Sequence, residues 1–186
     1  MSLELLKKNL EGSPIVRMGE YDYFVSPITD GIPNMRPEVL SEVLDEVVRV
    51  GDFNCDLICA PEAMGIPLAV PLSLRLGLPY NIIRKRRYGL PGEVSVHQVT
   101  GYSEKEFYVN GVENGDRVTL VDDVLSKGGT LRAIVQAFRS MGVELVDVIV
   151  VVEKGDCRHS LEEELEIRIK TLVRVEVRDG KLRILS

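Results

Sequence analysis

Two kinds of hydrophobic pattern alternate along the chain. Apolar residues recur at helical spacing in four segments, which we predict as helices: residues 3–10, 36–51, 63–77 and 129–142. Short, nearly continuous apolar runs predict buried strands at residues 56–60, 80–85, 118–123 and 146–152, and a last β segment with a turn at Asp179-Gly180 is predicted at 169–186. Because strands alternate with helices, we predict an α/β fold, a mainly parallel twisted sheet flanked by helices.

The alternation breaks down between residues 86 and 110. This stretch is rich in glycine and polar residues and alternates only weakly between apolar and polar positions. A long segment of this kind within a compact domain is typical of a flexible antiparallel lid. With 186 residues, no internal repeat and no linker, the chain is predicted to form a single domain, residues 1–186.

Composition narrows the class of protein. Hydrophobic residues make up 45% and charged residues 28%, which is typical of a globular protein, and the net charge of -6 argues against a general nucleic-acid surface. No apolar run approaches the roughly 20 residues of a membrane span, and the N-terminal segment lacks the apolar region of a signal peptide. The three cysteines lack metal-ligand spacing, so we predict reduced thiols in a cytoplasmic protein without zinc.

The segment VTLVDDVLSKGGTLRA carries the clearest candidate chemistry. Asp122 and Asp123 follow an apolar run, and the loop at residues 126–130 then leads into a predicted helix. Glycines at 128 and 129 and the helix N-terminus suit an anion, although a tight turn with a threonine cap would look alike. The chain has neither a Walker A match nor a dinucleotide fingerprint. Carboxylates beside a phosphate loop are reasonable if they bind sugar hydroxyls or a hydrated Mg²⁺.

At this segment the chain resembles the signature of type I phosphoribosyltransferases. The resemblance implies a site for 5-phosphoribosyl 1-diphosphate (PRPP). Asp122 and Asp123 are then the catalytic pair, which holds the ribose 2- and 3-hydroxyls and a Mg²⁺ cofactor through water. The 5-phosphate is assigned to Ser126, Lys127, Gly128, Gly129 and Thr130. The acids then face the sugar while the loop faces the phosphate.

A second stretch resembles the adenine-type branch of this family. There a Glu-Ala-Arg-Gly-like turn, which often contains a non-proline cis peptide, forms the pyrophosphate loop; in this chain Met64 stands in place of the usual arginine. Arg84 and Lys85 match the family's Arg-Lys pair after the next strand. The pyrophosphate-binding residues implied are Glu62, Ala63, Met64, Gly65, Arg84 and Lys85.

The resemblance also implies a hood and a lid. The stretch YDYFVSPITDGIP resembles the N-terminal hood that covers the purine, at about residues 13–35, with base contacts near Tyr21, Tyr23 and Phe24, although these aromatics would equally suit an ordinary strand. The lid, at about 86–110, would contribute Arg87, Glu93 and Tyr102. Glu93 is alternatively a solvated lid acid. Adenine-specific members commonly have glutamate where this chain has Gly101.

Together these stretches resemble archaeal purine phosphoribosyltransferases acting on hypoxanthine and guanine. The implied reaction converts either base and PRPP to IMP or GMP and pyrophosphate, in a homodimeric enzyme that binds neither nucleic acid nor membrane. An adenine phosphoribosyltransferase making AMP is the alternative. A PRPP-sensing regulator is a second alternative, which the acidic charge and the short N-terminal helix disfavour. The hood disfavours a pyrimidine transferase.

Overall fold

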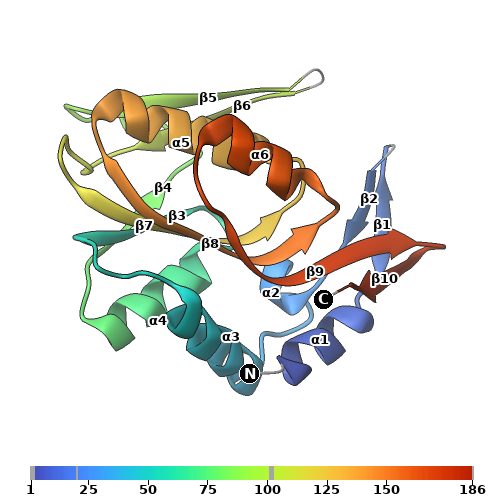
Figure 1. Cartoon of the computed structure of the whole chain (residues 1–186). Coiled ribbons are helices and arrows are strands. Elements are labelled where there is room, and N and C mark those ends of the chain that lie inside the picture. The colour runs from blue at the N-terminus through green and yellow to red at the C-terminus, as the bar shows by residue number, and fades with distance from the viewer. Residues whose placement is uncertain (1–2, 20, 101–102, 186) are drawn as a thin grey trace.

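The structure, a computed structural model, describes residues 3–19, 21–100 and 103–185, apart from the side chains of residues 97–105 (Figure 1). Its central sheet runs in the order β10-β9-β8-β7-β3-β4, and all neighbours are parallel except β10, which is antiparallel to β9. The strands are β3 (Leu57–Pro61), β4 (Tyr80–Ile83), β7 (Arg117–Leu125), β8 (Glu144–Lys154), β9 (Lys170–Arg178) and β10 (Lys181–Ile184). The predicted α/β class is confirmed.

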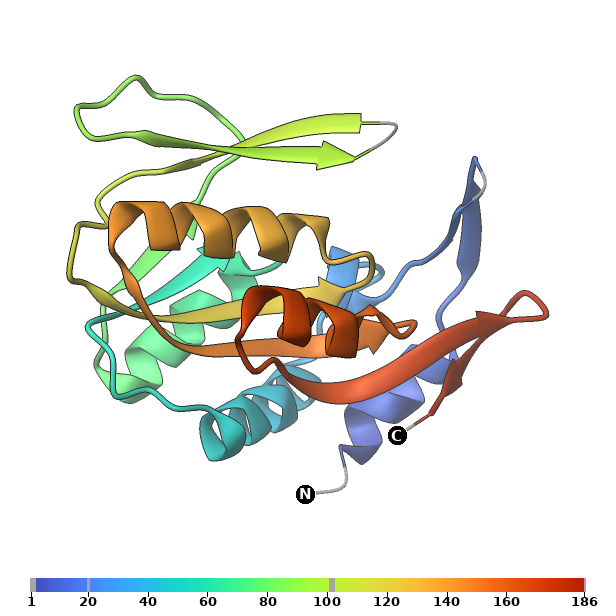
Figure 2. The ribbon, with the colours of Figure 1, turned by 45° about the horizontal axis from the view of Figure 1, so that its top comes forward.

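Helices cover both faces of this sheet (Figures 1 and 2). Side chains alternate between the faces along each strand, so Ile58 and Ala60 of β3 face one apolar cluster while Leu57 and Cys59 face the other. The first cluster includes buried residues of α1 (Glu4–Glu11), α3 (Pro37–Val50) and α4 (Ile66–Leu76). The second includes buried residues of α5 (Gly129–Met141) and α6 (Cys157–Leu165).

Most predicted elements are found within a few residues of their expected bounds. The turn at Asp179-Gly180 joins β9 to β10 as predicted, with both residues at positive φ. The largest difference is in α4, which begins at Ile66 instead of residue 63. Strand β7 continues to Leu125 instead of ending at residue 123, β4 ends at Ile83 instead of residue 85, and β8 extends two residues further at each end. Helix α6 was missed because its sequence is mostly polar, and of its residues only Leu161 and Leu165 are buried.

The hood region holds a β-hairpin and a short helix. Strands β1 (Ile15–Met18) and β2 (Tyr21–Phe24) pair antiparallel, and α2 (Pro27–Asp30) follows. Helix α2 begins at this point because Ser26 caps it: the Ser26 Oγ accepts a hydrogen bond from the Thr29 amide at 3.3 Å, and Pro27 occupies the first turn. The hairpin stands beyond the carboxyl ends of the parallel strands (Figure 2).

The lid region is an antiparallel hairpin, as predicted. Its strands are β5 (Val94–Thr100) and β6 (Ser103–Val109), which lie over α5 (Figure 2). Val96 and Phe107 are buried in the same apolar cluster as α5. The base of the hairpin is joined to the sheet through paired backbone hydrogen bonds between Arg84 and Tyr108. The lid is therefore anchored at its base.

Candidate active site

Unequal pairing on the two sides of β7 opens a crevice in the sheet. Strand β3 pairs with β7 only as far as Cys59 opposite Leu120, whereas β8 stays paired through Glu153 opposite Leu125. Asp122 and Asp123 therefore lie inside β7, beyond its last pairing with β3, and do not end the strand as predicted. Such a crevice beyond the carboxyl ends of parallel strands is where open α/β sheets bind ligands.

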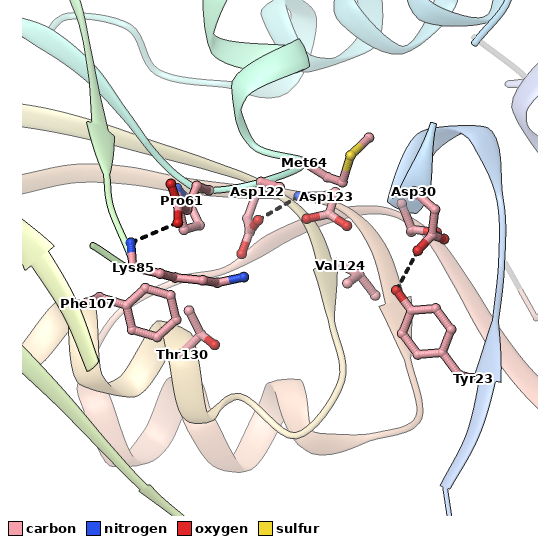
Figure 3. Close-up of a pocket in the computed structure, with 13 residues that line it drawn as sticks. Tyr23, Asp30, Pro61, Met64, Lys85, Phe107, Asp122, Asp123, Val124 and Thr130 are labelled. Carbon is pink, nitrogen blue, oxygen red and sulfur yellow. Dashed lines mark hydrogen bonds between the residues drawn. The ribbon is translucent and has the colours of Figure 1, made fainter. Parts of the chain in front are cut away.

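A pocket of about 450 Å³ fills this crevice (Figure 3). Four parts of the chain contribute to it: the hood, the turn after β3, the junction of β4 with the lid, and the end of β7 with the loop after it. The lining residues are Tyr23, Thr29, Asp30, Pro61, Glu62, Ala63, Met64, Lys85, Phe107, Asp122, Asp123, Val124 and Thr130.

The aspartate pair lies on the wall of this pocket. The Asp123 amide donates a hydrogen bond to the Asp122 Oδ1 at 2.9 Å. Burial and the neighbouring Asp123 charge raise the pKa of Asp122 well above its ordinary range, and burial also raises the pKa of Asp123. Two carboxylates that resist ionisation together in the substrate-free protein form a site prepared for a cation or for hydroxyl donors.

The loop after β7 turns at Gly128, directly before helix α5 begins. Gly128 adopts a φ of 71°, a conformation that favours glycine, and a Cβ there would lie 2.7 Å from the Leu161 Cδ2, so that side chain would have to shift. Helix α5 begins at Gly129, so its N-terminal amides and positive dipole end adjoin the loop. Of the predicted loop residues, only Thr130 lines the described pocket.

The turn after β3 is shaped by close packing. The Glu62–Ala63 peptide is cis, as the family resemblance implied. A Cβ on Gly65 would lie 2.5 Å from the Pro61 carbonyl oxygen, so the turn accepts no side chain there. Met64 lines the pocket, and a Cβ on Gly31 of the hood would lie 4.0 Å from its Cε, so Met64 approaches the hood.

Arg84 and Lys85 have different environments. The Arg84 Nε lies 2.9 Å from the Glu62 Oε2, outside the pocket lining, whereas Lys85 lines the pocket and its amide donates to the Glu62 Oε1 at 3.0 Å (Figure 3). Glu62 thus holds the pair in place. Among the described lining residues four carry carboxylates and Lys85 alone carries a cationic group. An anionic leaving group would therefore need a further cation at this site.

The hood contributes residues that sequence reasoning missed. Tyr23 lines the pocket and donates its hydroxyl to the Asp30 Oδ1 at 2.8 Å, while the Asp30 Oδ2 accepts from the Ser26 amide at 3.0 Å (Figure 3). Burial and the bonded Asp30 raise the pKa of Tyr23. Thr29 and Asp30 of the hood had not been predicted as site residues, nor had Phe107 of the lid strand β6. The capping pattern Ser-Pro-Ile-Thr-Asp at 26–30 is the sequence signal from which Asp30 could have been predicted as a site residue.

The other two predicted aromatics lie away from the pocket. Phe24 is 4% exposed and packs in the core beneath the hood, so its side chain does not line the pocket. The Tyr21 hydroxyl instead lies 2.7 Å from the Ser126 Oγ of the loop after β7. Of the three predicted base-binding residues, only Tyr23 has its side chain on the pocket.

Glu93 acts as a structural acceptor at the base of the lid. Its carboxylate accepts hydrogen bonds from the Tyr88 amide at 2.8 Å, the Gly89 amide at 3.0 Å and the Asn110 side chain at 3.1 Å. Burial acts to raise the pKa of Glu93, but these donors and Arg87 outweigh it and lower the pKa overall. Arg87 is largely exposed. Tyr102 lies outside the described residues, as does the side chain of His97.

The donor set fits a metal that is shared with a substrate. Within the described ranges, no group of three or more histidine, cysteine, aspartate or glutamate side chains could enclose a metal ion. Mg²⁺ is commonly held by one or two carboxylates together with waters and substrate phosphates, which is what Asp122 and Asp123 would allow.

No helix in the described part of the chain is long and apolar enough to cross a membrane.

The chain is similar to known phosphoribosyltransferases in its domain match and in its sequence. Residues 38–176 match the family model described as the phosphoribosyl transferase domain. A hypoxanthine/guanine phosphoribosyltransferase of Methanothermobacter thermautotrophicus is 52% identical over 182 residues, which cover 98% of this chain and 94% of that protein. The protein of the same name from Methanocaldococcus jannaschii is 48% identical, with 97% and 100% covered.

Solved structures agree on the fold. The adenine phosphoribosyltransferase of Thermoanaerobacter pseudethanolicus superposes with a TM-score of 0.73 at 24% identity, covering 92% of this chain and 99% of that one. That of Leishmania tarentolae gives a TM-score of 0.75 at 20% identity, with 94% and 88% covered. From its matching domain, its relatives and its fold, the chain belongs to the phosphoribosyltransferase family, in the type I branch.

Proposed function

We propose that this protein is a purine salvage enzyme that transfers the 5-phosphoribosyl group of PRPP to hypoxanthine or guanine, releasing pyrophosphate and forming IMP or GMP. One observation carries the proposal: a single crevice holds a pair of half-buried carboxylates, and a glycine turn at the N-terminus of a helix follows directly after them. Relatives near 50% identity over almost the whole chain bear the name of this activity, which supports the choice of bases.

The pocket can accept PRPP in one orientation. The 5-phosphate is assigned to the loop at 126–130 and to the N-terminus of α5, where amides and hydroxyls are available. The ribose hydroxyls then meet Asp122 and Asp123, and the pyrophosphate meets the turn at 62–65 together with Lys85. This order separates the acids of the site from the 5-phosphate.

The chemistry is a displacement at the sugar carbon C1. The bond from C1 to the pyrophosphate oxygen breaks and its electron pair leaves with the pyrophosphate. A purine ring nitrogen supplies the pair for the new C–N bond and gives up its proton to the departing pyrophosphate or to water. Positive charge develops on the ribose in between. Asp122 and Asp123 line the pocket where the ribose is placed, and a bound cation would favour their ionised form, whose negative charge would then stabilise that state. Closure of the lid would exclude water, which would otherwise capture the sugar.

Mg²⁺ is proposed as the cofactor, held by Asp122 and Asp123 through water and by the substrate. Bound there, it would neutralise negative charge on the pyrophosphate. The excess of carboxylates over cationic side chains in the pocket supports this assignment. Lys85 would contact the pyrophosphate directly, whereas Arg84 would act by holding Glu62 in position.

The purine is proposed to lie under the hood. Tyr23 and Asp30 form that wall of the pocket, and we expect backbone groups of the hood to read the edge of the base. Gly101 in place of the glutamate of adenine-type members supports a 6-oxopurine over adenine. A single domain (residues 1–186), a homodimer and a cytoplasmic location, where PRPP and free bases occur, complete the proposal; the free thiols of Cys55, Cys59 and Cys157 are consistent with that location.

The activity is tested with the purified chain, PRPP and Mg²⁺, offering hypoxanthine, guanine, adenine and xanthine separately. We expect nucleotide and pyrophosphate to form in equal amounts, with hypoxanthine and guanine well ahead of the other two bases. Turnover of adenine alone would replace the proposed specificity with the adenine alternative. Formation of no nucleotide with any base would overturn the proposed function.

A further inference from the structure

One contact joins the hood to the phosphate loop. The Tyr21 hydroxyl, on β2, lies 2.7 Å from the Ser126 Oγ, although the two residues are 105 positions apart in the sequence. Tyr21 does not line the pocket described above. Through its contact with Ser126, the Tyr21 side chain lies at the end of the site that is assigned to the 5-phosphate, away from the purine.

Two cationic side chains accompany this tyrosine. The Lys154 Nζ, at the carboxyl end of β8, lies 3.6 Å from the centroid of the Tyr21 ring, and the Lys127 Nζ lies 5.6 Å from it. Lys154 also donates a hydrogen bond to the Asp22 carbonyl of β2. Within the described part of the chain, neither lysine is bonded to a carboxylate, so their charge gives this side of the loop a positive potential in an otherwise acidic protein.

We propose that Tyr21 is a positioning residue for the 5-phosphate of the sugar substrate, and that Lys154 adds the cation on the hood side of that phosphate site. The inference rests on the proposed function. A serine hydroxyl has one hydrogen to donate. When the Tyr21 hydroxyl donates to the Ser126 Oγ, the hydrogen of Ser126 is left for a phosphate oxygen. Tyr21 thus acts through Ser126.

The same strand connects this phosphate site to the purine side of the pocket. Tyr21 and Tyr23 are two residues apart on β2, so their side chains lie on one face of the strand, with ring centroids 6.4 Å apart. Tyr23 in turn is bonded to Asp30 on the pocket wall. A phosphorylated sugar that fixes Tyr21 would therefore also hold the hood wall in place.

The test is calorimetric binding of ribose 5-phosphate to the whole protein, with ribose as the unphosphorylated comparison. Tyr21→Phe removes only the hydroxyl, so we expect its dissociation constant for ribose 5-phosphate, and its KM for PRPP, to rise by about 3- to 10-fold, as for one lost hydrogen bond. Lys154→Met should also weaken binding and reduce its dependence on salt. Tyr80→Phe, on an exposed tyrosine of β4, is the matched control and should bind as the wild type does.

A double variant separates positioning from a merely structural role. If Tyr21 acts through Ser126, adding Tyr21→Phe to Ser126→Ala should weaken ribose 5-phosphate binding no further. Additive losses, or a Tyr21→Phe variant with wild-type affinity and wild-type KM, would overturn the inference while leaving the transferase activity of the wild type intact. Wild-type protein that forms no nucleotide and binds no ribose 5-phosphate would instead overturn the proposed function, and the inference with it.

Discussion

At the scale of single residues, the two adjacent aspartates show how a ligand site weakens the protein that carries it. Burial and mutual repulsion raise the pKa of Asp122 above its ordinary 3.8, so the folded protein holds its proton more tightly than the unfolded chain does. Stability must then fall as the pH rises above that value and through the pKa of the folded state, and it stays low at neutral pH. The ligand, by bringing cations or hydroxyl donors, would relieve this repulsion.

Replacing Asp122 by asparagine should therefore stabilise the substrate-free protein at neutral pH while abolishing activity. Asparagine keeps the oxygen that accepts from the Asp123 amide and loses the charge. We expect a rise in Tm of about 2–4 °C for each kcal/mol gained, together with a fall in kcat/KM of about 100-fold or more, as for other preorganised charges. Calorimetry at pH 4 and at pH 7.5 checks the cause, because the difference in Tm between variant and wild type should shrink at the lower pH. Undiminished turnover by Asp122→Asn, or by the double variant that adds Asp123→Asn, would rule out the ribose assignment.

At the scale of elements, the turn after β3 depends on the absence of a side chain at Gly65. A Cβ there would lie 2.5 Å from the Pro61 carbonyl oxygen and 2.9 Å from the Ala60 Cβ, and neither atom belongs to a flexible side chain. We expect Gly65→Ala to lower the free energy of unfolding by about 1–3 kcal/mol and to raise the KM for PRPP, since the turn must shift. Urea unfolding measures the first and steady-state kinetics the second. Gly12→Ala is the control, because its Cβ would meet only atoms 4.0 Å away; equal effects from both changes would contradict the packing explanation.

The base of the lid depends on one hydrogen-bond acceptor, the carboxylate of Glu93. The Glu93 carboxylate accepts from two backbone amides and from Asn110, whereas the amide of glutamine offers a single acceptor oxygen. Because the pKa of Glu93 is lowered on folding, its contribution to stability is present above its ordinary pKa of 4.5 and is lost as the pH falls through the folded value. Glu93→Gln should speed amide hydrogen exchange at Tyr88 and Gly89 by about 10-fold near neutral pH. Exchange unchanged there, or changed equally by the exposed-site control Glu163→Gln, would show that the carboxylate does not hold the loop.

The same elements show how far the sequence could be used to predict the site. The apolar runs and helical spacing predicted the sheet and its major helices because burial on one or two faces leaves a direct pattern in the sequence. The motif at 122–130 could be assigned to the end of a strand and the start of a helix, because an apolar run precedes it and helical spacing follows it. The contact of Tyr21 with Ser126 could not be predicted, since it depends on how a hairpin far away in sequence leans over the sheet. Phe24 and Tyr23 are neighbours of similar chemistry, and only strand pleating decides that one enters the core and the other the pocket.

At the scale of the whole molecule, charged side chains are distributed unevenly between the pocket and the phosphate loop. Carboxylates dominate the described pocket wall, with Lys85 the one cationic group there, while Lys127 and Lys154 lie together near the phosphate loop. The protein alone therefore neutralises the 5-phosphate end better than the pyrophosphate end. A divalent cation that enters with the substrate would correct the imbalance, and within the described residues the chain has no cluster to hold that cation by itself.

Metal removal should consequently act on catalysis and leave the fold unaffected. In excess chelator we expect turnover to be lost while the Tm of the substrate-free protein stays the same, because the side chains bind the metal only together with PRPP. With Mg²⁺ present and PRPP at about 100 times its dissociation constant under those conditions, binding should add about 2.7 kcal/mol of stability, or roughly 5–10 °C in Tm, and without Mg²⁺ the same PRPP concentration should add clearly less. Asp123→Asn serves as the matched variant, since it should lose most of this increase while its Tm without ligand does not fall. A Tm that drops in chelator without substrate would point to a structural metal instead, and full turnover in chelator would rule out the proposed role of the ion.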